Sequence, residues 1–461
     1  MPIDLIEITE EQAVLLIQLQ EGHFHDLKSK EIAPGSMTKT MSAFANADGG
    51  ELYVGIEETA RGRRWNGFAN TEAANGHIQA FEALFPLGDY FDYQLFQTPN
   101  YPGLVLKAEI RKTADIRYAT NGKAYLRRGA QNLPQESEDQ LTRLCFNKGI
   151  ASFENETVRD ELRNVTNSVT IIDFLLNIVP TAEPEPWLRK QQLIRGDLPT
   201  VCCELLYNDE PQIVLPKAAV KIYRYRTSEA EGSRETLEFD PITIEGPVYD
   251  LIRGAVAKTV EIIEDIPVLG KVGLEKIEYP REAIHEIITN AVIHRDYSLN
   301  DDIHVRIFDN RIEVQSPGRL PAHITIRNIL DERFARNPSL VRLINKFPEP
   351  PNKDVGEGLN TAFDAMRRLN LKEPVVSEKE NAVMVTLRHE QLASAEEVIV
   401  QYLTENESIN NSRAREICHE PSDSKIRKTF AKMIEAGLIE RVPGKSGKAA
   451  AYRQPARRRR R

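Results

Sequence analysis

Most of the information about this chain lies in residues 281–298, which read Arg-Glu-Ala-Ile-His-Glu-Ile-Ile-Thr-Asn-Ala-Val-Ile-His-Arg-Asp-Tyr-Ser. On a helix, Glu286 and Asn290 lie one turn apart on the same face, and His294 continues this polar stripe. A carboxylate base beside a metal-binding amide suits a nucleotide and its Mg²⁺. The alternative is an ordinary amphipathic helix with a solvated polar face. The apolar residues expected to pack inward are Ile287, Ile288, Ala291 and Val292.

The residues after this helix predict a hairpin and a glycine-rich helix start. Strands are expected at 303–308 and 311–315, joined by a turn at Asp309-Asn310. Ser316-Pro317-Gly318 follows, and Gly356-Glu357-Gly358 then opens a helix that runs to Leu369. A glycine pair at a helix start presents backbone N–H groups to phosphates.

Length and composition describe a modular chain. The 461 residues exceed what one core holds and predict roughly three domains. With 41% hydrophobic and 28% charged residues, the chain shows no apolar run of membrane-spanning length and no signal segment after Met1. We therefore expect a cytoplasmic protein without a membrane partner. The cysteines lack metal-ligand spacing and are expected to be buried reduced thiols, namely Cys145, Cys202, Cys203 and Cys418.

Residues 1–147 predict a mixed α and β domain. The helix capped by Ser36 carries an apolar stripe and stops at Gly49-Gly50, where the hydrophobic period changes to that of a strand. The other expected elements are a helix at 10–20 and strands at 24–29, 51–58, 104–110 and 124–127.

Two groups of charged residues in this domain are candidate sites. Glu21, Asp26 and Glu58, with Lys28 beside them, form a possible carboxylate cluster for a divalent metal, Mg²⁺ or Mn²⁺, and phosphodiester cleavage. Strand-end acids are more often simply solvated. Arg127 and Arg128 offer guanidinium groups to nucleic-acid phosphates, and the alternative for them is a surface turn.

A family resemblance rests on several motifs together. Four segments together resemble the Schlafen AlbA-type domain. They are Glu21 through Asp26-Leu27-Lys28, residues 42–50, Val54-Gly55-Ile56 and residues 125–129. The resemblance implies a nucleic-acid-associated domain. In Schlafen nucleases the positions matching Glu21, Asp26 and Glu58 form a metal-dependent ribonuclease site, although the second acid there is usually Glu and the third usually Asp.

Residues 148–260 predict a connecting α/β region. Strands are expected at 198–207, 211–216 and 220–225, and a helix follows Gly246-Pro247.

Residues 261–390 include the helix expected within residues 281–298. They resemble a second family, the C-terminal ATPase-like domain of bacterial proteins labelled RecG-like helicases. This domain is a branch of the GHKL nucleotide-binding superfamily, with an α/β sandwich fold. The resemblance implies that Glu286 activates water, Asn290 binds magnesium, and Gly318, Gly356 and Gly358 hold the nucleotide. Ser316 stands where the superfamily usually has an adenine-reading Asp. The chain has no Walker A motif, so no helicase motor is predicted.

Residues 394–453 predict a winged helix, with helices at 395–404, 412–418 and 422–436 and a wing at 442–453. From Asp423 to Arg461 there are thirteen Lys and Arg against three Asp and Glu, although the whole chain has a net charge of −9. The alternatives are a solvated helix or a protein-binding winged helix, and the basic tail at 454–461 adds attraction to phosphates. In the third helix, Ile426, Phe430 and Met433 form a core stripe, whereas Lys425, Lys428 and Lys432 face nucleic acid.

The sequence thus predicts an α/β and α+β multidomain protein with a Schlafen AlbA-type domain, a GHKL-like domain and a winged helix. The leading hypothesis is a regulatory protein, similar to a transcriptional regulator, that binds DNA or RNA and is itself controlled by ATP. An alternative is a metal-dependent endoribonuclease that acts on tRNA or other structured RNA in defence or stress, and a third is a structural scaffold with vestigial sites. The superfamily resemblance favours a homodimer.

Overall fold

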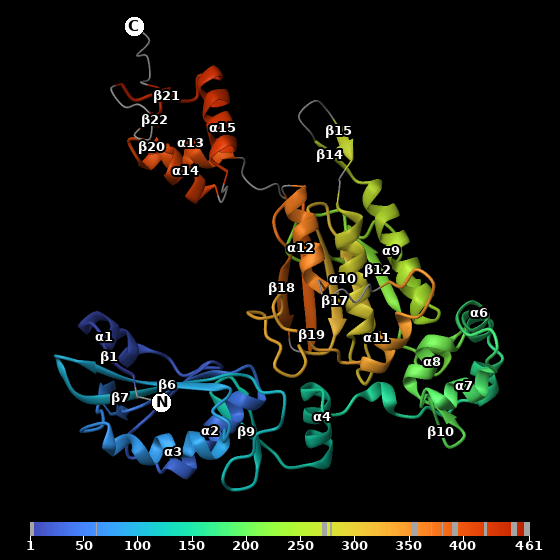
Figure 1. Cartoon of the computed structure of the whole chain (residues 1–461), viewed down its shortest axis with the longest axis horizontal. Coiled ribbons are helices and arrows are strands. Elements are labelled where there is room, and N and C mark those ends of the chain that lie inside the picture. Colours follow the sequence, from blue (N-terminus) through green and yellow to red (C-terminus); the bar gives the residue numbers. More distant parts are fainter. Residues whose placement is uncertain are drawn as a thin grey trace. The chain divides into compact units, whose positions relative to one another are not determined.

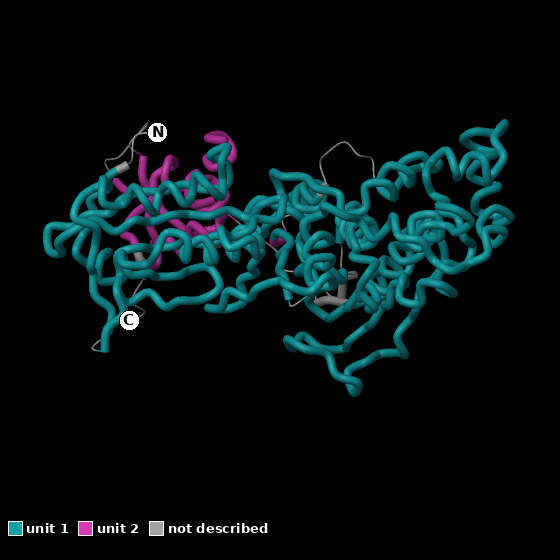
Figure 2. The backbone as a smooth tube through the Cα atoms, turned by 90° about the horizontal axis from the view of Figure 1, so that it is seen from below, with its two compact units in different colours: residues 1–369, 373–388 teal, residues 370–372, 389–461 magenta. Residues whose placement is uncertain are grey.

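The computed structural model describes residues 4–60, 62–269, 274–276, 279–351, 358–369, 371–379, 381–389, 395–418, 422–443 and 450–455. The chain divides into two compact units, coloured separately in Figure 2. One comprises Met1–Leu369 and Glu373–Arg388, and the other comprises Asn370–Lys372 and His389–Arg461. The predicted class, a mixed α/β multidomain protein, is confirmed. No helix in the described part of the chain is both long and apolar enough to cross a membrane.

The N-terminal part of the first unit, residues 4–148, is built on a five-stranded sheet with strand order β1-β6-β7-β3-β2 (Figure 1). Alternate residues of β3 face opposite sides. Leu52 and Val54 pack in one buried cluster with α2 and α3, whereas Tyr53 packs in another with α1. The bounds are β1 (Asp4–Glu7), α1 (Glu10–Gln18), β2 (His25–Lys28), α2 (Pro34–Asn46), β3 (Gly50–Val54), α3 (Asn75–Leu84), β6 (Phe91–Thr98) and β7 (Tyr101–Ile110).

Two local predictions in this part were wrong. The strand expected at 51–58 is broken at Gly55, whose φ of +114° turns the chain out of the sheet, so that β4 pairs with β5 instead. Helix α2 begins at Pro34 after Ala33 rather than at Ser36, since proline favours the first turn. The remaining elements are β4 (Ile56–Thr59), β5 (Gly62–Trp65), η1 (Glu72–Ala74), β8 (Ala124–Arg128), β9 (Gln131–Gln135) and α4 (Glu138–Lys148).

Short helices fill residues 153–213, where strands were expected at 198–207 and 211–216. The Thr200 hydroxyl accepts a hydrogen bond from the Cys203 N–H and caps a helix, α8. Cys202 and Cys203 are free and buried in that helix, as predicted, whereas Cys145 and Cys418 are only half-buried. The elements are η2 (Phe153–Asn155), α5 (Leu162–Thr166), α6 (Val169–Ile178), α7 (Pro184–Lys190), β10 (Ile194–Arg195), β11 (Leu198–Pro199), α8 (Val201–Tyr207) and η3 (Pro211–Ile213).

Residues 220–388 form a six-stranded sheet with order β13-β12-β16-β17-β19-β18. Helices α9, α10 and α12 lie side by side against it (Figure 1). β12 and β13 belong to this sheet, although they lie in residues 148–260, which were expected to connect two domains. The bounds are β12 (Val220–Arg224), η4 (Arg234–Thr236), β13 (Ile242–Ile244), α9 (Val248–Glu264), β14 (Pro267–Leu269), β15 (Leu274–Lys276), α10 (Arg281–Ile293), β16 (Ile303–Ile307), β17 (Arg311–Pro317), α11 (Pro338–Ile344), α12 (Gly358–Arg368), β18 (Val375–Lys379) and β19 (Ala382–Arg388).

The described residues of the second unit form three helices and a small antiparallel sheet with order β20-β22-β21. All three helices were predicted to within a few residues. Ile426, Phe430 and Met433 are buried together, which confirms the predicted core stripe. The bounds are α13 (Ala395–Glu405), β20 (Ile409–Asn410), α14 (Asn411–Ile417), α15 (Asp423–Glu435), β21 (Glu440–Arg441) and β22 (Ala451–Arg453).

Candidate nucleotide site

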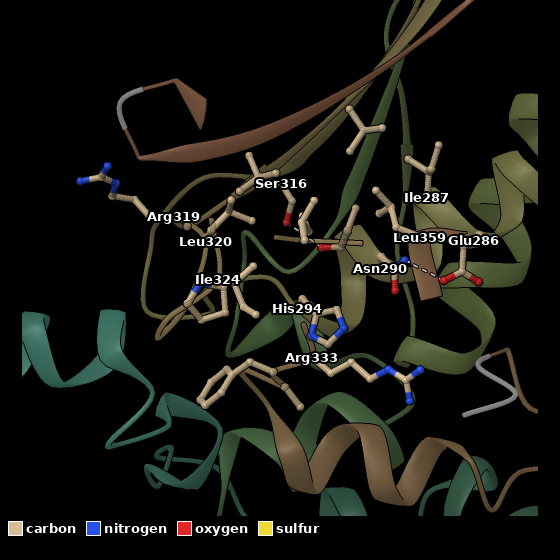
Figure 3. Close-up of a pocket in the computed structure, with 18 of the residues that line it drawn as sticks. Glu286, Ile287, Asn290, His294, Ser316, Arg319, Leu320, Ile324, Arg333 and Leu359 are labelled. Carbon is tan, nitrogen blue, oxygen red and sulfur yellow. Dashed lines mark hydrogen bonds between the residues drawn. The ribbon is translucent and has the colours of Figure 1, made fainter. Parts of the chain in front are cut away.

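A cavity of about 280 Å³ opens beside α10. Its walls come from α10, the end of β17, the loop at 318–335, the start of α12 and β19. Most lining side chains are apolar, and a few polar groups project between them (Figure 3). A largely apolar cavity with a few placed polar groups is typical of a site for an organic ligand.

Glu286 and Asn290 lie on the wall formed by α10, as the one-turn spacing predicted. The Asn290 side-chain amide donates a hydrogen bond of 2.8 Å to the Glu286 carboxylate (Figure 3). Burial raises the pKa of Glu286, although the hydrogen bond from Asn290 opposes this change. A carboxylate with a raised pKa is a suitable proton acceptor.

His294 continues the same face of α10 into the cavity (Figure 3). Its ring is partly exposed, but Nδ1 is buried and has no hydrogen-bond partner among the described residues. Burial, helped by the nearby charge of Arg336, lowers the pKa of His294 to about 4, so the ring is neutral at pH 7. The sequence placed His294 on the polar stripe but gave no sign that it would lack a partner.

Ser316 and Gly318 shape the opposite wall. The Ser316 hydroxyl donates to the Ala291 carbonyl at 2.7 Å, which joins the end of β17 to α10. Gly318 has a φ of +114°, and a Cβ there would stand 2.7 Å from the Asp296 Cβ. Only glycine fits this close approach. Gly358 begins α12, whereas Gly356 lies outside the described residues.

The loop after Gly318 is held by the N-terminal part of the unit. Arg319 lines the cavity, and its guanidinium, which extends away from the other labelled residues in Figure 3, donates to the Asp48 carboxylate at 2.6 Å. His23 also bonds to Asp48 at 2.7 Å. Burial would raise the pKa of Asp48, but the His23 hydrogen bond and the charges of Arg319 and Lys112 hold it well below its usual range.

Lys112 makes a second connection to this loop. Its buried ammonium donates to the carbonyls of Leu320 at 2.7 Å and Ile324 at 3.1 Å, and both of these residues line the cavity. Burial lowers the pKa of Lys112, although the carboxylate of Asp48 favours the charged form. Arg319, Asp48 and Lys112 were not identified from the sequence, because the contacts join segments more than 200 residues apart.

The acids proposed for a metal site are only partly brought together. Lys28 donates to Asp26 at 2.8 Å and lies 3.7 Å from Glu21. Asp26 is buried and also accepts from Thr40 at 2.9 Å. Glu58 is exposed on β4. Within the described ranges, no three His, Cys, Asp or Glu side chains are grouped to hold a metal, so the predicted three-acid site is not formed.

The predicted nucleic-acid contacts also differ from one another. Arg127 is buried and donates to the carbonyls of Gly22 and His25, so it supports the chain instead of facing solvent. Neither the predicted phosphate contact nor the alternative of a surface turn describes this buried side chain. Arg128 is exposed. On α15 the side chains of Lys425, Lys428 and Lys432 are exposed, away from the buried stripe.

Comparison with known proteins identifies two domains. Residues 21–136 match the family model described as "Schlafen, AlbA_2", and residues 300–387 match the one described as "Putative ATP-dependent DNA helicase recG C-terminal". These matches point to a nucleic-acid-associated, ATP-binding protein. No curated protein matches the chain. A solved structure that resembles it is the DIP2311 protein from Corynebacterium diphtheriae, at 16% identity and a TM-score of 0.41, covering 96% of this chain and 97% of that one.

Proposed function

We propose that this chain, with its Schlafen AlbA_2 domain and its RecG-type C-terminal domain, is a nucleic-acid-binding regulator controlled by ATP. In this proposal, MgATP occupies the cavity beside α10 and changes how tightly the flanking modules hold nucleic acid. In this proposal the nucleic acid is duplex DNA, as it is for a transcriptional regulator.

The residues of the cavity fit ATP and Mg²⁺. Asn290 would bind the magnesium ion, and Glu286, one turn away, would accept a proton from water. When bound, the magnesium ion supplies positive charge that offsets the charge on the phosphate oxygens. The unpartnered Nδ1 of neutral His294 leaves one polar atom in this wall for a ligand or a water molecule to satisfy after a small movement of the ring.

The observation that carries the regulatory proposal is the double attachment of the cavity loop to the N-terminal part. Arg319 pairs with Asp48, and Lys112 donates to two carbonyls of the same loop. A ligand that shifts this loop has to change these bonds. Its binding energy is therefore coupled to the N-terminal part, and the coupling is reciprocal.

Nucleic acid would be held by the Schlafen AlbA_2 domain and by α15, which we interpret as the recognition helix of a winged helix. The lysines of α15 lie on its exposed face, at a spacing suited to backbone phosphates. The arginine run at 457–461 lies outside the described residues. We also propose a homodimer, which sedimentation of the intact protein tests.

The test is binding of labelled duplex DNA and tRNA with and without MgATP or a non-hydrolysable analogue. We expect nucleotide to change the affinity of the wild type for its preferred nucleic acid by at least about fivefold. Asp48→Asn should still bind nucleotide but lose most of this change, because Arg319 loses its closer charged partner and keeps only Glu378, at 3.9 Å.

The control is Asp92→Asn, which removes an exposed carboxylate paired with Arg111 far from the cavity loop in sequence and should behave as wild type. Calorimetry on the same samples reports nucleotide binding directly. Bound nucleotide without any change in nucleic-acid affinity would refute the regulatory proposal, and absence of nucleotide binding would refute the ATP site itself.

A further inference from the structure

Four charged side chains line the described part of the cavity: Glu286, Arg319, Glu332 and Arg333. Three of them have partners. Glu286 accepts from Asn290, Arg319 is bound to Asp48, and Glu332 lies 3.3 Å from His323. Arg333 is exposed and forms no hydrogen bond or ion pair with any residue that the structure describes. Among the described residues of the wall, Arg333 is thus a cation without a charged partner.

The backbone that carries Arg333 is held in place before that residue. The N–H groups of Asp331 and Glu332 donate to the Asn328 carbonyl at 2.9 and 2.8 Å, which closes a turn. Asn328 in turn bonds to Thr325 and to the carbonyl of His323.

The backbone is also held after Arg333. The Phe334 ring lines the cavity and occupies the space where a Cβ on Gly149 would stand, 2.1 Å from the ring. Arg336 is buried and bonds to the carbonyl of Arg319 and to Asp296. These contacts on both sides of Arg333 fix the point at which its side chain leaves the backbone.

This loop is tied to the start of α12. The Asn360 side-chain amide donates to the Leu330 carbonyl at 2.9 Å. Leu359 and Asn360 both line the cavity, one and two residues after the first residue of α12, Gly358. The first backbone N–H groups of an eleven-residue helix carry partial positive charge and favour anionic groups.

Arg333 extends toward this same side of the cavity. In Figure 3 its side chain passes His294 and reaches the side where Asn290, Glu286 and Leu359 lie. The Asn290 amide, the start of α12 and the Arg333 side chain thus all border the same cavity. Among the described wall residues, Arg319 is paired with Asp48 and Glu286 and Glu332 are acidic, so Arg333 is the charged group there that attracts an anionic ligand.

We propose that Arg333 binds the phosphate chain of the nucleotide and makes the cavity selective for nucleoside di- and triphosphates over nucleosides. The inference rests on the proposed ATP site and adds the residue that reads the phosphates. The guanidinium fork donates two parallel hydrogen bonds to phosphate oxygens, which a lysine ammonium does not reproduce.

The test is calorimetry with ATP, ADP and adenosine in the presence of Mg²⁺ on the full chain. Arg333→Gln should bind ATP and ADP about tenfold to a hundredfold more weakly than the wild type, and its affinity for adenosine should not change. Arg333→Lys should lie between the two. Arg327→Gln, an exposed arginine on the same loop that does not line the cavity, is the matched control and should bind like the wild type.

Three results would overturn the inference. Unchanged ATP affinity in Arg333→Gln would show that the guanidinium does not touch phosphate. An equal loss for ATP and adenosine, with an unaltered melting temperature, would assign Arg333 to the base or to the shape of the wall. Failure of the wild type to bind ATP would remove the inference together with the ATP site, whereas the first two results leave that site intact.

Discussion

The neutrality of His294 leads to a quantitative prediction. The perturbation is a fall in pH from 7.5 to 5, with His294→Gln as the comparison. Burial and the charge of Arg336 lower the pKa of this ring to about 4, against 6.5 for a histidine in water. At pH 5 we therefore expect only about a tenth of the His294 rings to be protonated, whereas an ordinary histidine would be about 97% protonated.

The lowered pKa of His294 also reduces the free energy of unfolding at acidic pH. Below pH 6.5 the unfolded chain takes up a proton at this position and the folded chain does not, so stability falls as the pH drops from 6.5 toward 4. A difference of about 2.5 pH units corresponds to about 3 kcal/mol. Because the ring borders the water of the cavity, this figure is an upper limit. Above pH 6.5 the ring is neutral in both the folded and the unfolded chain, so this loss of stability is absent there.

The assay is nuclear magnetic resonance of the histidine ring nitrogens, with the His294 signal assigned by its loss in His294→Gln. The expected result is a ring that remains neutral at pH 5, and a wild type that loses more stability than His294→Gln between pH 6.5 and 5. A His294 ring that titrates near pH 6.5, or equal losses in both proteins, would refute the argument from burial.

Four further predictions follow from the sites described above. Glu286→Gln should retain MgATP binding while any hydrolysis falls by about 10²- to 10⁴-fold, measured by calorimetry and phosphate release; loss of binding would contradict it. Removal of residues 394–461 should weaken duplex DNA binding and flatten its dependence on salt, and an equal affinity with an equal salt slope would argue against this. Asp26→Ala should lower the free energy of unfolding by about 3–5 kcal/mol, because it strips a buried carboxylate from Lys28 and Arg127. We also expect the wild-type protein to cleave no tRNA in the presence of Mg²⁺ or Mn²⁺. Cleavage by the wild type that is lost in a folded Asp26→Ala variant would overturn this expectation.

Local patterns predicted the elements around the cavity well. The helix at 281–293 and the Glu286–Asn290 contact follow from a period of 3.6 residues and a spacing of four. The hairpin of β16 and β17 follows from two apolar runs and a polar turn. These features depend on neighbours within one helical turn or one hairpin.

Other features depend on context that a short window does not contain. The apolar run at 198–207 fits a buried strand or a buried helix equally well, and the Thr200 cap decides for the helix. Arg127 was proposed as a phosphate contact because of its guanidinium group, but β8 packs against α2, and this guanidinium is buried against the carbonyls of Gly22 and His25. The bond between Arg319 and Asp48 joins residues 271 positions apart. No local pattern marks such a pair.

The placement of β12 in the sheet has a consequence for synthesis on the ribosome. β12 pairs with β13, which follows it closely, but its other edge is completed by β16, so about 80 residues separate Arg224 from Ile303. At a rate of roughly 5–20 residues per second, that edge waits for about 4–16 s. An unpaired strand edge is a template for pairing with other chains. Chains halted before Ile303 therefore expose this edge of β12, and we expect them to aggregate or to require a chaperone more than chains extended past β19, in which β12, β16 and β17 each have both neighbours.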